Sequence, residues 1–532
     1  MAITETGRFD VALNGAFRRY GVFGEQGAVI VNDNSDFVIT AGANRFATTQ
    51  LSVGNSVFGE ASVDGVGSSI LLRGRTDAPN SIIIGIGKDG FGRLDVRNGG
   101  LVRLEELTLG TNSGALESAQ FGVEGARGEV YIANESRFEI VGDDARISIG
   151  LSYASFLTFP VSSGLLKIEG NSVFDIRSNG TDNFPFAELI VGSGRDPSDG
   201  RLEVLTGSHV NIFTPDYDAL LEIGRDNRTF GSALFDDGLV SIGSTNGAAR
   251  IMMGNFGGAA ELLARNGSTL LLDGGALSEV VGANRLGNAN LNLESGSTLQ
   301  MITNGGMNLP GDSAESLMVI GSDGGSGSLS ANESLIDMSA QSFAGINIGV
   351  GAVDPLDSRG VVTLSNGAEM RVLSREGNAF ANIGFDGVQQ AEGKQALGEL
   401  RAFNSTISFL AEGPAAADGS RYNASAFWAV GRDGGQGSAV LDNSTLTIRS
   451  ANDAASLIVG LQDFIGGRAQ GTLVAKNGTQ VTVEGSVADL SVGLSGDGAD
   501  GAGTTSVEAG AQIVIRGTSS DPFDSFFGVG NS

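Results

Sequence analysis

The stretch from Ile86 to Leu104, IGKDGFGRLDVRNGGLVRL, decides the fold. After Gly92, polar and apolar residues alternate through RLDV, an Asn-Gly turn begins at Asn98, and the alternation resumes in VRL. Alternation with a period of two places successive side chains on opposite faces of a strand, so Leu94 points inward and Asp95 outward. The stretch therefore predicts two half-buried strands joined by a tight turn.

The same pattern recurs along nearly the whole chain. One series of glycines opens each repeat, and a second series closes it at the end of a short run such as LxVG or IxIG. The first and last opening glycines, Gly27 and Gly503, are 476 residues and 14 steps apart, which gives 34 residues per repeat. The opening glycines are Gly27, Gly59, Gly92, Gly128, Gly164, Gly200, Gly231, Gly258, Gly287, Gly327, Gly360, Gly398, Gly437, Gly471 and Gly503. The closing glycines are Gly54, Gly87, Gly110, Gly150, Gly192, Gly224, Gly254, Gly282, Gly321, Gly349, Gly384, Gly431, Gly460, Gly493 and Gly530.

These repeats predict an all-β fold, a single right-handed parallel β-helix or β-solenoid. A unit of three short strands cannot satisfy its own backbone groups, so the units before and after it must supply the hydrogen-bond partners. We expect about 15 coils of roughly 34 residues over residues 27–532, with residues 1–26 as an N-terminal cap. We also expect the helix to continue or to be capped beyond Ser532, because a bare last coil leaves backbone groups unpaired.

The composition excludes several classes of protein. Cys is absent, so disulfides and thiolate metal sites are excluded. The formal net charge of −28 disfavours nucleic acid as a partner. No run of 18 apolar residues occurs, so we expect no membrane insertion. One His and five Tyr leave little material for acid–base catalysis.

Two polar columns accompany the repeat. Asn recurs six places after an opening glycine, and we interpret this column as structural because stacked amides bond along the axis and Asn tolerates the left-handed turn conformation. Its members are Asn98, Asn134, Asn366, Asn404, Asn443 and Asn477. Asp recurs after closing glycines and in the last loop, at Asp89, Asp226, Asp323, Asp386, Asp433, Asp497 and Asp500. Carboxylates from stacked loops are candidate ligands for Ca²⁺, whereas Asp-Gly is also a favoured turn former, and we place the turn interpretation first.

One outward column offers candidate catalytic residues. It reads Arg103, Glu139, Asp175 and Asn211 through four consecutive repeats. Glu139 and Asp175 would lie about one strand spacing apart, close enough for one carboxyl to act as an acid. The alternative is an ordinary solvated face with Arg103 offsetting the negative charge, and we favour that alternative.

The phrase IGxDGxGxLxVxNGSxVxI, as it stands from Ile86 and again in VGRDGGQGSAVLDNSTLTI from Val430, resembles the β-strand repeats of large exported proteins of Gram-negative bacteria. It is similar to the passenger regions of autotransporter-type adhesins, and more so to the stalks of type I-secreted proteins with RTX-type calcium-binding tails. The resemblance covers about Gly27 to Ser532. It implies adhesins, surface-layer proteins or biofilm matrix components that lack enzymatic residues in the repeat.

The sequence therefore predicts a non-enzymatic extracellular or cell-surface β-solenoid of a bacterium, acting as an adhesin stalk, layer component or filament subunit. Self-association through coil ends or lateral faces is expected, and a glycan or another cell-surface molecule is a further expected partner. The first alternative is a polysaccharide-processing β-helix enzyme that uses Glu139 and Asp175. The second is a protein similar to phage tailspikes.

Overall fold

The structure is a computed structural model. It describes residues 2–3, 8–13, 20–22, 26–41, 49–55, 58–75, 80–86, 90–107, 116–123, 125–152, 161–179, 186–194, 197–305, 314–351, 357–385, 395–413, 424–462, 468–495, 500–518 and 525–531. All the regular secondary structure in these residues consists of β-strands. None of the described residues forms a helix long and apolar enough to cross a membrane.

The chain divides into two compact units, which we describe separately. The first consists of Met1–Gly254, Gly258–Leu263 and Ser268–Leu271, and the second of Asn255–Gly257, Ala264–Gly267 and Leu272–Ser532. In each unit the strands alternate in chain order among three sheets, here named A, B and C. Two strands, β25 (Ala259–Arg265) and β26 (Thr269–Gly274), contain residues of both units.

The strands of the first unit follow one another in a fixed order. Sheet A contains β1 (Ala2–Ile3), β4 (Gln26–Asn32), β7 (Phe58–Asp64), β10 (Phe91–Arg97), β13 (Arg127–Ala133), β16 (Ser162–Glu169), β19 (Ser198–Leu205) and β22 (Thr229–Asp236). Sheet B contains β2 (Arg8–Leu13), β5 (Asp36–Ala41), β8 (Ser69–Arg75), β11 (Leu101–Leu107), β14 (Arg137–Gly142), β17 (Val173–Ser178), β20 (His209–Thr214) and β23 (Leu239–Ser244). Sheet C contains β3 (Tyr20–Val22), β6 (Thr49–Asn55), β9 (Asn80–Ile86), β12 (Leu116–Val123), β15 (Asp144–Ser152), β18 (Ala187–Gly194), β21 (Ala219–Ile223) and β24 (Ala248–Met253).

The second unit repeats this order. Sheet A contains β28 (Asn288–Glu294), β31 (Ser326–Asn332), β34 (Ser358–Ser365), β37 (Ala396–Phe403), β40 (Gln436–Asp442), β43 (Arg468–Lys476) and β46 (Asp500–Val507). Sheet B contains β29 (Thr298–Thr303), β32 (Leu335–Ala340), β35 (Glu369–Ser374), β38 (Thr406–Ala411), β41 (Thr445–Ser450), β44 (Gln480–Gly485) and β47 (Gln512–Gly517). Sheet C contains β27 (Leu277–Gly282), β30 (Glu315–Ser322), β33 (Phe343–Val350), β36 (Ala379–Phe385), β39 (Ala426–Arg432), β42 (Ala454–Gln462), β45 (Val487–Ser495) and β48 (Ser525–Asn531).

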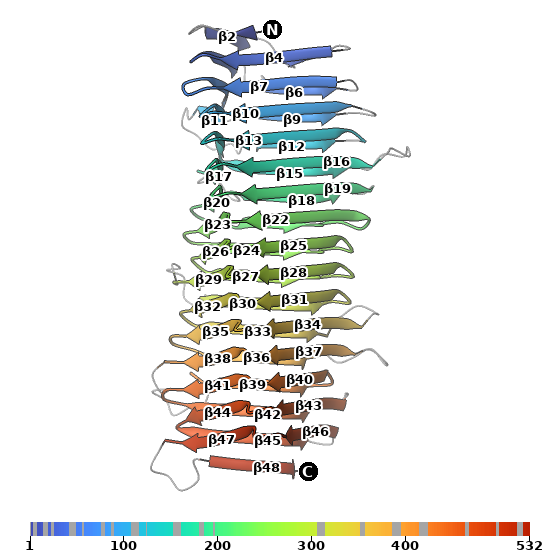
Figure 1. Ribbon diagram of the computed structural model, residues 1–532, viewed down its shortest axis with the longest axis vertical. Helices are drawn as coiled ribbons and strands as arrows, with labels where there is room; N and C mark the ends of the chain where they lie inside the picture. Colours follow the sequence, from blue (N-terminus) through green and yellow to red (C-terminus); the bar gives the residue numbers. More distant parts are fainter. Residues whose placement is uncertain are drawn as a thin grey trace. The chain divides into compact units, whose positions relative to one another are not determined.

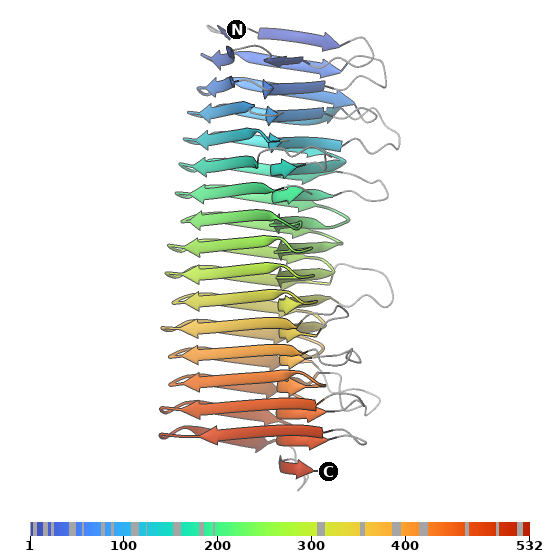
Figure 2. The same cartoon turned by 90° about the vertical axis from the view of Figure 1, so that its right-hand side faces the viewer.

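Within each unit, neighbouring strands of a sheet come from successive coils and pair in parallel. In the first unit Gly128 pairs with Gly164, and in the second Gly398 pairs with Gly437. Figure 1 shows the coils of each unit stacked strand upon strand, and Figure 2 shows stacked strands pointing the same way. The predicted all-β parallel β-solenoid with roughly 34 residues per coil is therefore confirmed.

Strands also occur in the segment that the sequence predicts as a cap. Within residues 1–26, β1 pairs with β4, β2 with β5 and β3 with β6, all in parallel. The strand ladder of the first unit thus includes residues from this segment. That these residues cap the solenoid stays a prediction.

The inward side chains form the core of each unit. In the first unit the rings of Phe138 and Phe174 lie 5.1 Å apart between centroids, and both are fully buried. In the second unit Trp428 and Phe409 are fully buried. Their burial follows from the alternation seen in the sequence, because every second residue of a strand points into the coil.

The two glycine columns lie against each other where sheets A and C meet. A Cβ on the opening glycine Gly164 would lie 2.3 Å from the backbone nitrogen of Gly150 and 2.3 Å from the carbonyl oxygen of Phe121. The closing glycine Gly150 has φ of +68°, and a Cβ on it would lie 2.2 Å from the carbonyl oxygen of Asp199. Glycine is therefore required here for two reasons, the direct backbone contact and the left-handed conformation.

The structure corrects the closing column at three repeats. Gly85 shares the register position of Gly54, because Ile84 pairs with Val53 and Ile86 with Asn55. Gly122, with φ of +72°, occupies the column one coil later. The predicted closing residues Gly87 and Gly110 lie outside the described residues. In the second unit Gly282 pairs with Ile320, so Ala283, with φ of +65°, occupies the column instead.

The opening column is also corrected in the least regular stretch. Gly258 and Gly287 precede β25 and β28 rather than lying within them. Ala289 pairs with Gly327 and so takes the place of an opening glycine. A search for glycine cannot find this position, because alanine occupies it.

Candidate functional site

The proposed catalytic column has the predicted register. Arg103 pairs with Glu139, Glu139 with Asp175, and Asp175 with Asn211 on successive strands of sheet B. The structure thus brings the two candidate carboxylates onto neighbouring strands.

Both carboxylates are held by basic or amide side chains. Arg137 contacts both of them, at 3.4 Å from Glu139 and 3.3 Å from Asp175. Asp175 is buried, and its Oδ1 also accepts a hydrogen bond of 2.7 Å from Nδ2 of Asn211. Arg177 lies 3.5 Å from the same carboxylate. This is the geometry of an ion-pair ladder along the stacked strands. A solvated face, the interpretation that the sequence favoured, does not describe Asp175, which is 2% exposed. A catalytic role for the pair stays a prediction.

The predicted calcium ligands fall into three groups. Asp89, Asp386 and Asp497 lie outside the described residues, and Asp500 is described only by its backbone, at the start of β46. Asp226 accepts hydrogen bonds from the Ser193 hydroxyl and the Gly194 backbone. Asp433 accepts one from Arg432, while Asp323 and Asp433 have φ of +50° and +48°.

These positions favour the role of turn former for Asp323 and Asp433. Among the described residues, no group of three or more His, Cys, Asp or Glu side chains could hold a metal ion. Calcium binding stays a prediction, which melting with and without a chelator would test.

The Asn column stabilises the turn between sheets A and B, as predicted. All six members have positive φ. Nδ2 of Asn134 donates to Oδ1 of Asn98 at 3.0 Å, and Nδ2 of Asn443 donates to Oδ1 of Asn404 at 2.6 Å. Amide ladders of this kind link one coil to the next.

A serine column beside it was not predicted. The hydroxyl of Ser172 accepts a hydrogen bond from the backbone N–H of Ser136, and the hydroxyl of Ser208 accepts one from Ser172. The same contact joins Ser405 to Ser444 in the second unit. The signal in the sequence is a Ser just before the second strand of many repeats, which the more visible Asn obscures.

A charged cluster lies on the outer face of sheet C in the first unit. Arg146 contacts Asp144 at 3.0 Å and Glu188 at 3.7 Å, and Arg225 contacts Glu188 at 3.5 Å. Burial raises the pKa of Glu188 and of Asp144 above their ordinary values, while the neighbouring arginines oppose that rise. These carboxyls are therefore groups whose titration affects the stability of the unit.

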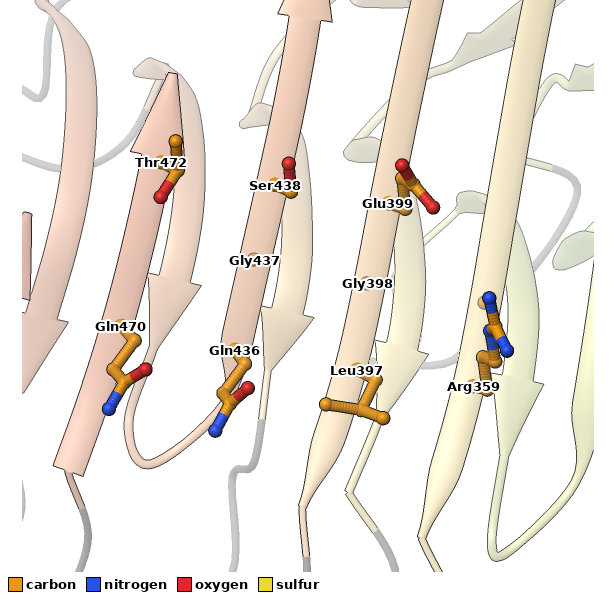
Figure 3. A pocket seen from close by; sticks show the side chains of 10 residues that line it. Arg359, Leu397, Gly398, Glu399, Gln436, Gly437, Ser438, Gln470 and Thr472 are labelled. Atoms are coloured by element: carbon orange, nitrogen blue, oxygen red, sulfur yellow. The ribbon is translucent and has the colours of Figure 1, made fainter. Parts of the chain in front are cut away.

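A groove crosses sheet A of the second unit over strands β34, β37, β40 and β43, and its volume is about 520 Å³. Its floor is formed by Gly360, Gly398 and Gly437. Two rows of outward side chains border it (Figure 3). The leading row stands just before the glycines and the trailing row just after them; they consist of Arg359, Leu397, Gln436 and Gln470, and of Glu399, Ser438 and Thr472.

The hollow has a physical cause in the glycine contact. A Cβ on Gly398 would lie 2.1 Å from the backbone nitrogen of Gly384, so the backbone of sheet A lies directly against sheet C at this column. No side chain separates the two sheets there, and the outer surface above the glycines is correspondingly low. The short side chains of Ser438 and Thr472 do not refill it (Figure 3).

Four polar side chains of the groove have no hydrogen-bond partner in the part of the chain that the structure describes. Among the described residues, the side chains of Gln436, Ser438, Gln470 and Thr472 make no hydrogen bond to other residues. Glu399 is different, because it forms an ion pair of 2.6 Å with Arg401. The groove therefore offers amide and hydroxyl groups and little net charge.

No family profile and no curated protein sequence matches the chain.

The last described coil exposes apolar side chains. Phe527 and Val529 of β48 are 63% and 66% exposed, whereas Leu490 and Val492, with which they pair on β45, are 4% and 7% exposed. These two residues continue the inward column of sheet C. The expected association through coil ends stays a prediction, and this surface is where it would be tested.

Proposed function

We propose that the protein is a non-enzymatic, extracellular β-solenoid of a bacterium that serves as a rigid stalk, layer component or filament subunit. We further propose that it belongs with the exported surface proteins that its repeat resembles. The observation that carries the proposal is the parallel register between successive coils of each unit, reinforced by side-chain ladders at the turns.

The ladders support a mechanical role. Each coil exchanges backbone hydrogen bonds with its neighbours, and serine and asparagine side chains add contacts in the same direction. In a repeat protein, stability is approximately the sum of such nearest-neighbour terms. A chain built in this way resists local opening, and therefore proteolysis, along each unit.

The fate of the candidate catalytic pair supports the same choice. Glu139 and Asp175 are engaged by arginines on both sides, so the groups that would transfer protons are ion-paired. We therefore place the polysaccharide-processing function behind the scaffold function.

One experiment separates these functions. The purified full chain is incubated with acidic and neutral polysaccharides, and is digested with trypsin in parallel. We expect no new reducing ends or unsaturated products, together with survival of the chain as large fragments. Product formation that disappears in Glu139→Gln would overturn the proposal.

A further inference from the structure

We propose that the outward face of sheet A in the second unit, between β31 and β46, is a docking surface for a second copy of this chain. We call this surface the docking face. The inference deepens the proposed function and rests on it, because it names the partner through which such a scaffold would assemble.

The charge of the docking face sets it apart from the protein as a whole. The chain carries a formal net charge of −28, so two copies repel each other over most orientations. On this face Glu399 is neutralised by Arg401, and at its margin Lys476 lies 3.5 Å from Asp442. Arg359 and Arg468 are the remaining charged side chains that the structure describes there. The rest consists mainly of Ser, Thr, Gln and Val side chains. The face therefore lacks the acidic excess of the chain as a whole, so two such faces approach at a lower electrostatic cost than two acidic faces.

The spacing of the rows identifies the occupant. Along a row, neighbouring side chains are separated by one strand spacing, about 4.8 Å. In an extended peptide laid across the strands, the side chains on one face are ~6.7 Å apart, so they do not match the spacing of the rows over several residues. The same face of a second copy has the same spacing, so each row of one copy can lie against a row of the other copy.

The lengths of the side chains fix the arrangement. A two-fold axis that lies between the faces, parallel to the direction of stacking, reverses the order of the rows. The leading row of one copy then faces the trailing row of the other. Gln436 lies opposite Ser438 of the second copy, and Gln470 lies opposite Thr472. A long amide meets a short hydroxyl in both cases, which fills the groove and lets the amide and the hydroxyl hydrogen-bond to each other when the interface excludes water.

The area is adequate for a specific dimer. Six strands at about 4.8 Å, each with about seven residues at about 3.3 Å, give on the order of 650 Å² per copy. The total of about 1,300 Å² lies within the range of about 1,200–2,000 Å² for stable interfaces.

The test is sedimentation velocity of the full chain across the micromolar range. We expect reversible dimers that become tighter as salt is raised, because salt screens the repulsion between two acidic copies. The variant S438E/T472E should weaken association at least about tenfold, since it buries unpaired charge. The control S232E/S241E adds the same charge at outward positions of sheets A and B in the first unit, and should associate like the parent chain.

A charge exchange tests the row pairing itself. The variant Q436K/Q470K should also dimerise poorly alone, but a mixture with S438E/T472E should restore association, because each Lys then faces a Glu. Each variant is accepted only if its melting temperature stays near that of the parent chain. A parent chain that remains monomeric at all concentrations, or an S438E/T472E variant that associates like the parent, overturns the inference. Either result, obtained with a chain that still resists trypsin and releases no products, leaves the proposed function standing.

Discussion

Sheet A carries the same glycine column in both units, but the rows beside it differ. In the first unit the leading row includes Phe58 and Phe91, whose rings lie 5.4 Å apart, and Arg127, which lies over the ring of Phe91 and forms an ion pair with Glu129 of the trailing row. In the second unit the corresponding rows carry unpartnered Gln, Ser and Thr. The inward columns thus specify the coil, while the outward rows vary independently and give each unit its own surface.

The largest loss of stability is expected from changes in the glycine column of sheet A, which both units share. Gly164→Val in the first unit and Gly398→Val in the second should each destabilise the protein by at least about 3 kcal/mol, because the new side chain collides with backbone rather than with a movable side chain. Denaturant or thermal unfolding measures this. The matched control is Gly367→Ala, where φ is +86° but a Cβ meets nothing within 4 Å, and about 1 kcal/mol is expected. Equal losses in all three variants would contradict the backbone contact between the glycine columns.

The second effect should be confined to the first unit. Asp175→Ala removes a buried acceptor from Asn211 and leaves Arg137 with one carboxylate fewer, so a loss of about 1–2 kcal/mol is expected. Thr447→Ala is the comparison, because Thr447 is an outward residue of sheet B in the second unit, and it should change the free energy of unfolding by less than about 0.5 kcal/mol. If Thr447→Ala proved as costly as Asp175→Ala, the ion-pair ladder would have no special role.

The third effect is a pH dependence. Burial raises the pKa of Glu188 in the folded state, so folding favours the protonated form. The stability associated with this group is greatest below its unfolded pKa and declines as pH rises through the folded pKa. The free energy of unfolding of Glu188→Gln should therefore rise relative to that of the parent chain as pH increases through that window, by less than about 1 kcal/mol. Melting curves from pH 4 to 8 measure the difference, and a difference independent of pH would refute the assignment.

The smallest changes in stability are expected from substitutions in the leading and trailing rows of sheet A. Arg127 is 66% exposed at its side chain, so Arg127→Ala should cost less than about 1 kcal/mol despite its ion pair. Gln436→Ala in the open groove should change stability by less than about 0.5 kcal/mol. Unfolding midpoints provide the comparison. A large loss in Gln436→Ala would show that its amide has a structural role within the chain.

Much of the fold could be predicted because the inward residues follow the repeat. The alternation around Leu94 and the Asn at fixed distance from each opening glycine gave the strands, the turns and the register of Glu139 with Asp175. Ala283 and Ala289 were missed, because the left-handed turn and the opening position are defined by the backbone, and a residue other than glycine can occupy them.

The groove could not be predicted for a different reason. It depends on the lengths of side chains in rows that run across strands, so residues such as Ser438 and Thr472, which are 34 positions apart in the sequence, become neighbours only in the folded chain. The sequence shows them as ordinary outward residues of separate repeats.

The in-register stacking of outward rows is tested most directly by engineered disulfides, because the natural chain has no Cys. Ser438 pairs with Thr472, so Ser438→Cys with Thr472→Cys should place the two Cα atoms about 4.8 Å apart, within the range for a disulfide, and should oxidise readily at high dilution. Ser438→Cys with Val474→Cys, displaced by two residues along β43, should not. Rapid oxidation of the second pair, or failure of the first in a folded chain, would contradict the register on which this account is built.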